Sequence, residues 1–69
     1  MTKEKSKILS NREKEILNLF AEGKRPKEIS ELLFLSYFTV RTHQTNIIQT
    51  LNASGITHAV SIAIRMGLI

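Results

Sequence analysis

Two helix-forming stretches of the sequence are separated by only two or three residues. Pro26 suits the first turn of a helix, where its missing N–H is not needed, and that helix should end near Phe34. Ser36 is a candidate N-cap for the next helix, which runs from about Tyr37 to Leu51 with no Gly or Pro inside. So short a connection between two helices is typical of a helix-turn-helix unit.

Further helix signals flank this unit. Ser10 and Glu13 match a capping box, and Gly23 stops the helix that follows, about 11–22. Ser54 can cap a last helix that ends at Gly67. No strand-like alternation occurs, so the sequence predicts an all-α fold of four helices. It divides into a flexible basic tail, 1–8, and one helix-turn-helix domain, 9–69.

Composition narrows the classes of function that remain. The 69 residues carry a net charge of +4 with pI near 9.9, and all six acids lie before Leu32, which favours a polyanionic partner. There is no Cys, so disulfides and thiolate metal sites are excluded and a reducing cytoplasm is the expected setting. The N-terminus lacks a signal-peptide core, and no run approaches the ~20 apolar residues of a membrane span.

The helix at 37–51 has one apolar and one polar face. At about 100° per residue, one side of this helix carries Val40, Ile47 and Leu51, which form the predicted core stripe. Phe38, Thr42, Thr45 and Gln49 lie opposite, with Arg41 and Asn46 on the flanks. An ordinary solvated face is the alternative, but such faces are usually rich in Lys and Glu. Arg pairs with guanine, Gln and Asn with adenine, and a Thr methyl with the thymine methyl, so we expect a base-reading face.

Phosphate contacts are expected around this helix. Lys24, Arg25 and Lys27 surround the start of the helix at Pro26, and Ser36 and Thr39 lie at the start of the next. Helix N-termini carry free amides and the positive end of the dipole, which bind phosphate. A basic run of this length that is merely solvated is the alternative.

A series of residues at fixed spacings extends from Leu9 to the C-terminus: Leu9–Leu17, Gly23, Lys27–Ser30, Leu35, Ser36, Thr39–Arg41, His43, Asn46, Ile47, Leu51, Ala59, Val60 and Met66–Leu68. Together they resemble the LuxR/GerE-type DNA-binding domain of bacterial transcription regulators. The resemblance implies a third helix in the DNA major groove and a fourth helix that pairs in a dimer. A chain that begins with Met and has 69 residues is expected to be of the stand-alone kind, and a fragment of a larger regulator is the alternative.

The resemblance also assigns residues to roles. Base-contacting positions fall on Phe38, Arg41, Thr42 and Thr45, and backbone-contacting positions fall near Lys27, Thr39, His43 and Ser54. The sequence departs from the family at Thr50 and Ile56, where Lys and Arg are usual, and at Thr45, where Lys is frequent. Each missing phosphate contact weakens non-specific affinity, so weak DNA binding by the lone chain is expected.

The last helix has more apolar surface than one core requires. A helix that covers one core needs an apolar stripe about 100° wide, and here the arc is roughly twice that. We expect the surplus, at Ala59, Ile62 and Met66, to form a homodimer interface, and additional core beneath the first helix is the alternative.

No pattern of catalytic or metal-binding residues is present. His43 and His58 are fifteen residues apart without Cys or Asp, and no phosphate-binding Gly-rich loop occurs, so we expect no enzyme activity, metal or cofactor. The sequence predicts a sequence-specific regulator that binds double-stranded DNA in the bacterial cytoplasm, associated with the nucleoid, with no membrane partner. RNA polymerase or a larger regulator is a further possible partner. The rival class is a protein-interaction module that pairs with and modulates a larger regulator.

Overall fold

The computed structural model describes residues 8–69, and within them the chain forms four α-helices and no strand. The helices are α2 (Asn11–Ala21), α3 (Pro26–Leu33), α4 (Tyr37–Thr50) and α5 (Ile56–Arg65). The predicted all-α fold is confirmed, with boundaries close to those expected. Most of the predicted tail, 1–7, lies outside the described residues, and Ile8 packs partly buried against the core.

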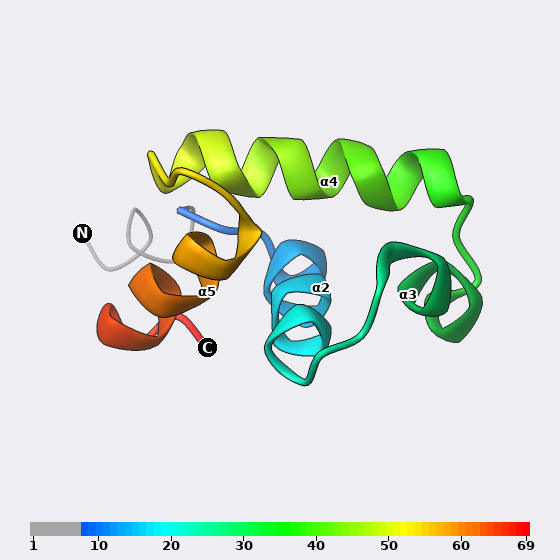
Figure 1. The fold of residues 1–69 in the computed structure, drawn as a ribbon, viewed down its shortest axis with the longest axis horizontal. Coiled ribbons are helices and arrows are strands. Elements are labelled where there is room, and N and C mark those ends of the chain that lie inside the picture. The colour runs from blue at the N-terminus through cyan, green and yellow to red at the C-terminus, as the bar shows by residue number, and fades with distance from the viewer. Residues whose placement is uncertain (1–7) are drawn as a thin grey trace.

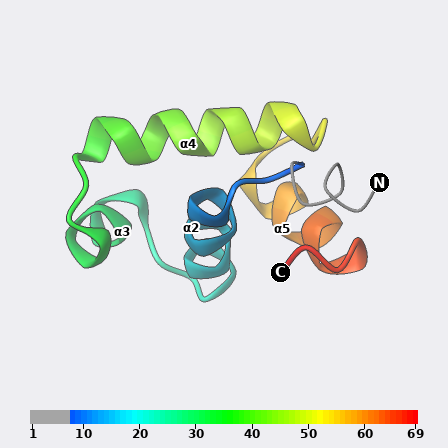
Figure 2. The same ribbon diagram turned by 180° about the vertical axis from the view of Figure 1, so that it is seen from behind.

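The longest helix lies along one side of the molecule. Figure 1 shows α4 across one long edge, with α3, α2 and α5 side by side beneath it, and the reverse view in Figure 2 shows the same order. The molecule measures 35 × 21 × 18 Å along its principal axes. Because α3, α2 and α5 all contact α4 from one side, the other side of α4 stays free.

The core is a thin layer between α4 and the other three helices. Val40 and Ile47 are completely buried and Leu51 almost so, which confirms the predicted stripe. The remaining buried apolar side chains are Leu9, Ile16, Leu17, Ile29, Ala59, Ala63 and Leu68. Burying each large aliphatic side chain contributes about 1.5–3 kcal/mol, so this stripe holds α4 on the domain.

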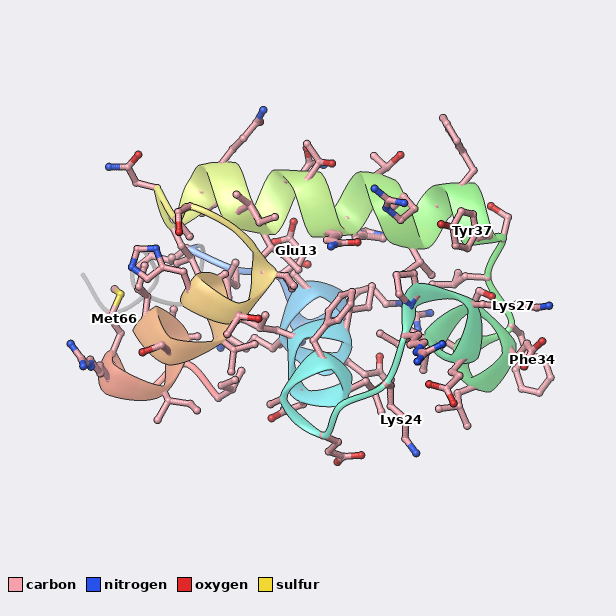
Figure 3. All side chains as sticks on the ribbon, in the orientation of Figure 1. Glu13, Lys24, Lys27, Phe34, Tyr37 and Met66 are labelled. Atoms are coloured by element: carbon pink, nitrogen blue, oxygen red, sulfur yellow. The ribbon has the colours of Figure 1, made fainter. Side chains whose placement is uncertain are left out.

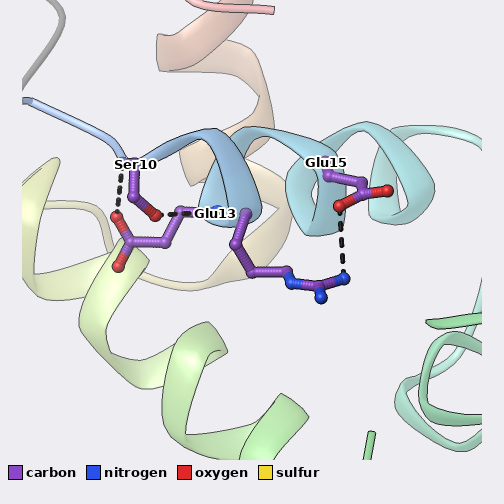
Figure 4. A network of polar contacts seen from close by, with 4 residues as sticks. Ser10, Glu13 and Glu15 are labelled. Carbon is purple, nitrogen blue, oxygen red and sulfur yellow. Dashed lines mark hydrogen bonds and ion pairs between the residues drawn. The ribbon is translucent and has the colours of Figure 1, made fainter. Parts of the chain in front are cut away.

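The start of α2 has the predicted capping box. The Glu13 N–H donates to Ser10 Oγ at 3.0 Å, and the Ser10 N–H donates to Glu13 Oε1 at 3.0 Å (Figure 4). Two first-turn amides therefore find partners without water. The neighbouring Arg12–Glu15 pair, at 3.2 Å, is solvent-exposed and adds little stability.

The predicted Ser54 cap of the last helix is wrong. The N-cap of α5 is Gly55, which has an extended backbone and offers no side chain. Ser54 instead donates its backbone N–H to Nδ1 of His58 at 2.9 Å, so a side chain from the first turn of α5 satisfies the amide before the cap. The end of the helix agrees better with expectation, because Gly67 follows Arg65 and the C-cap Met66 with φ of 72°.

The turn between α3 and α4 depends on an unusual residue. Phe34 adopts the left-handed conformation, φ 57° and ψ 42°, although its side chain is 94% exposed and gains no burial there. The Leu35 N–H donates to the Ser30 carbonyl at 2.9 Å and closes the end of α3. The left-handed conformation costs a residue with a Cβ roughly 1–2 kcal/mol, and Gly adopts it freely.

We therefore expect Phe34→Gly to raise the free energy of unfolding by about 1 kcal/mol relative to Phe34→Ala. The two variants both lack the ring and differ only in the Cβ, so the comparison isolates the backbone strain. Urea unfolding followed by circular dichroism measures the difference. A Gly variant less stable than the Ala variant would contradict this account of the turn.

Candidate nucleic-acid interface

The outward face of α4 is polar, exposed and nearly uncharged. Phe38, Arg41, Thr42 and Thr45 are all exposed, as are Asn46 and Gln49, whereas Val40 and Ile47 are buried behind them. The helix carries one formal charge, that of Arg41. The structure therefore brings the four predicted base-contacting side chains to the free side of one helix.

Arg41 is tied to the residue one turn before it. Its Nη1 donates to the Tyr37 hydroxyl at 2.9 Å, and the guanidinium carbon lies 5.8 Å from the centre of the Tyr37 ring. Tyr37 was not among the predicted site residues. The four-residue spacing of Tyr37 and Arg41 was visible in the sequence, since side chains so spaced meet on a helix surface.

Thr42 is also fixed within the helix. Its hydroxyl donates to the Phe38 carbonyl at 3.1 Å, so the Thr42 oxygen is left as an acceptor and its methyl group is held in one orientation. The Phe38 ring is 78% exposed and available to a partner. This face thus offers a guanidinium, a fixed acceptor, a methyl group and an aromatic ring.

The start of α4 is capped as predicted. Ser36 Oγ accepts the Thr39 N–H at 3.0 Å, and the two hydroxyls lie 2.9 Å apart. The cap uses the Thr39 amide, so a phosphate at this helix end would meet the amides of Tyr37 and Phe38, which precede the first intrahelical hydrogen bond. Ser36 and Thr39 therefore act as the cap of this helix end.

The start of α3 differs from expectation. The Glu28 carboxylate accepts the Arg25 N–H at 2.8 Å, so the chain's own acid already occupies the positive end of this helix. Lys27 lies at the same end of the molecule as Tyr37, whereas Lys24 lies on the side away from α4 (Figure 3). There Lys24 lines a shallow depression with Glu28, Glu31 and Leu32. Of these two predicted phosphate-binding lysines, Lys27 is the one at the end of the molecule where α4 begins.

The other predicted backbone contacts have mixed surroundings. Arg25 is exposed at the α3 N-cap, and His43 is partly buried beside the α4 core stripe. Ser54 is exposed, but its N–H and its hydroxyl both lie at hydrogen-bond distance from His58 Nδ1, at 2.9 and 3.2 Å. The DNA contacts assigned to these residues stay predictions.

The predicted dimer surface needs one correction. Ala59 is completely buried within the chain's own core, because α5 packs against α2 and α4 through this residue and Ala63, so it has no surface for a partner. Ile62 is partly buried, whereas Met66 is 46% exposed and Ile64 is 56% exposed. Ile64 and Met66 are two residues apart and so lie on opposite flanks of the buried stripe, whereas Ile62 is four residues before Met66 and lies on its flank.

Neither a metal site nor a membrane-spanning helix is found among the described residues. No group of three or more His, Cys, Asp or Glu side chains converges there as a metal site would require. No helix in residues 8–69 is both long and apolar enough to cross a membrane.

Comparison with known families gives a match over most of the chain. The model described as "Bacterial regulatory proteins, luxR family" matches residues 7–63. The spore germination protein GerE of Bacillus subtilis is 42% identical over 60 residues, which cover 87% of this chain and 81% of that protein. The transcriptional regulatory protein LiaR of the same organism is 51% identical over 61 residues. The chain spans 29% of LiaR and between 29% and 41% of several other relatives.

A solved structure agrees with the sequence match. The structure of the transcription factor GerE superposes with a TM-score of 0.84 at 40% sequence identity, over 87% of this chain and 90% of that chain. The similarity therefore covers the arrangement of all four helices as well as the local motifs.

Proposed function

Because the chain belongs to the luxR family of bacterial regulatory proteins, we propose that it is a sequence-specific transcription regulator that binds double-stranded DNA through α4. LiaR is named a transcriptional regulatory protein and GerE a transcription factor, which supports this class of function. The regulator would act in the bacterial cytoplasm, on the nucleoid.

The observation that carries the proposal is the outward face of α4. Its side chains can form hydrogen bonds and apolar contacts with a partner, but only Arg41 carries a charge. Such side chains match the edges of DNA bases, whereas a face that only meets solvent is usually rich in charge. Arg41 would pair with guanine, Thr42 and Thr45 would accept hydrogen bonds or touch thymine methyls, and Phe38 would supply an apolar contact.

The shape of the domain supports major-groove binding. An α-helix of 14 residues is about 21 Å long, and the major groove, about 12 Å wide, admits one helix. No other helix of the described residues covers the free side of α4 in Figure 1. The domain can therefore lay this helix in the groove without rearrangement.

Phosphate contacts would hold this helix in register. Lys27 lies at the end of the molecule where α4 begins, and the amides of Tyr37 and Phe38 there would donate to a phosphate. His43 and Ser54 would add contacts further along the backbone, and Arg25 at the α3 N-cap would add a charge. Few cations are available, so affinity from phosphates alone would be low.

A homodimer through α5 would compensate for this weakness. Met66 is a large apolar side chain that is 46% exposed, and the partly buried Ile62 lies one helical turn before it on the same flank, which supports a self-complementary interface. Two linked domains bind two half-sites with an effective concentration that raises overall affinity. The two α4 helices would then lie about one DNA turn, ~34 Å, apart on a palindromic site.

A second candidate function is pairing with a larger regulator. The Phe38 ring is 78% exposed and Tyr37 is 50% exposed on a helix with one cation, and exposed aromatic residues are frequent at protein interfaces. Under this alternative the same face of α4 binds protein. RNA polymerase is a further partner that a bound regulator would contact.

The base-reading proposal predicts the effect of Arg41→Ala. Loss of a bidentate guanine contact should cost roughly 1–3 kcal/mol on the selected site and relax the preference at one base pair. Binding-site selection followed by fluorescence anisotropy on the selected duplex measures both effects. Ser61→Ala, an exposed change on α5, is the control and should leave both unchanged.

Two results would count against base reading. One is an Arg41→Ala protein whose selected sequences match those of the wild type. The other is a wild-type chain with no duplex binding below micromolar concentration at low salt but tight binding to a protein partner, which would favour the second candidate function.

The dimer proposal predicts a concentration-dependent mass. Sedimentation of the wild-type chain over a range of concentrations should show a monomer–dimer equilibrium, and Met66→Lys should weaken the dimer about tenfold or more. Lys at a helix C-terminus suits the helix dipole, so the fold should tolerate it. Asn18→Lys adds the same charge on exposed α2 and serves as the control. A wild-type chain that stays monomeric even on a palindromic duplex would refute the dimer.

A further inference from the structure

We propose that Tyr37 positions Arg41 for guanine recognition by holding one side of its guanidinium and leaving the other side free to read. The inference rests on the proposed DNA-reading function and extends it to a residue outside the predicted base contacts. In Figure 3 the Tyr37 side chain lies at the start of α4, at the end of the molecule nearest α3.

The hydroxyl of Tyr37, more than its ring, makes the contact. Arg41 Nη1 lies 2.9 Å from Oη, a normal hydrogen-bond length, whereas the guanidinium carbon is 5.8 Å from the ring centre. A cation over an aromatic face is attracted within about 6 Å, so the ring contribution is near its outer limit. The guanidinium is therefore held at the edge of Tyr37 by a directional bond.

The bond leaves enough donors for a base. Arg has five N–H groups in a planar fork, and Tyr37 engages one of them, on Nη1. The Nε–H and one Nη2–H still point in parallel from the opposite edge, which is the arrangement that pairs with guanine O6 and N7. Tyr37 thus fixes the plane of Arg41 without using its reading edge.

A neutral partner suits this helix better than an acid would. From Leu32 to the C-terminus the chain has no acidic side chain, so no carboxylate next to Arg41 in sequence can orient it. A carboxylate there would cancel the single charge of α4 and repel the phosphates of DNA. The phenol oxygen accepts the hydrogen bond and leaves the positive charge intact.

Both side chains are solvent-exposed, so the pair stabilises the fold little. Its effect on binding is larger because a free Arg side chain loses much rotamer freedom when it is fixed on a base. An Arg41 side chain that Tyr37 already holds loses less rotamer freedom on binding. The same pairing limits the orientations of Arg41 and so sharpens the choice of base pair.

The test is a double-mutant cycle with Tyr37→Phe, Arg41→Ala and the double variant on the duplex selected by the wild-type chain. Phe keeps the ring and removes the hydrogen bond. Tyr37→Phe should lower affinity about fivefold, the value of one hydrogen bond, and relax preference at the base pair that Arg41→Ala relaxes. In the Arg41→Ala background the same change should have no effect, because coupled residues are not additive.

A second measurement needs no DNA. In the free protein, the ¹⁵N relaxation of the Arg41 side-chain Nε–H should show a more ordered group in the wild type than in Tyr37→Phe. A purely structural role for Tyr37 would leave Arg41 order unchanged and would alter the thermal midpoint instead. Equal Arg41 order in the two proteins therefore overturns the proposal.

The outcomes separate this inference from the proposed function. A wild-type chain that selects no sequence would defeat both. If the base preference is relaxed by Arg41→Ala but unchanged by Tyr37→Phe, only the positioning role of Tyr37 is defeated. A Tyr37→Phe effect of equal size with and without Arg41, or tighter binding by Tyr37→Phe, also defeats it, since Tyr37 would then act independently of Arg41 or compete with DNA for it.

Discussion

Burial of one narrow stripe of α4 is the interaction on which the rest of the domain depends. Val40, Ile47 and Leu51 are enclosed by side chains of α2, α3 and α5, so three short helices are organised by a single longer one. A 69-residue chain buries only about 60% of its unfolded surface, so its core is thin. The same geometry releases the opposite side of α4, where the polar side chains lie. The free face of α4 thus follows from how its buried stripe packs.

Local signals in the sequence were sufficient for most of the fold. Ser10 with Glu13, Gly23, Pro26 and Ser36 each act within a few residues, through capping bonds and backbone preferences, and their effects are found where expected. The α4 stripe was predictable because helical periodicity alone separates its two faces.

Features that depend on a second side chain or another helix were not predictable. His58 satisfies the amide of Ser54, so the cap of α5 falls on Gly55. Ala59 looked free on a helical wheel but is covered by neighbouring helices, and the Glu28 carboxylate occupies a helix end that seemed open to phosphate. The Tyr37–Arg41 hydrogen bond depends on side-chain rotamers, which periodicity does not give. The fold was therefore predictable from the sequence, whereas these features of the site are visible only in the structure.

The central claim is that the free face of α4 reads DNA, and NMR titration of the ¹⁵N-labelled chain with its selected duplex tests it most directly. The account predicts that the largest shift changes lie at Arg41, Thr42 and Thr45 and around the start of α4. Amides on the exposed side of α2 should hardly change. Shifts confined to α5, or none at saturating duplex, would contradict it.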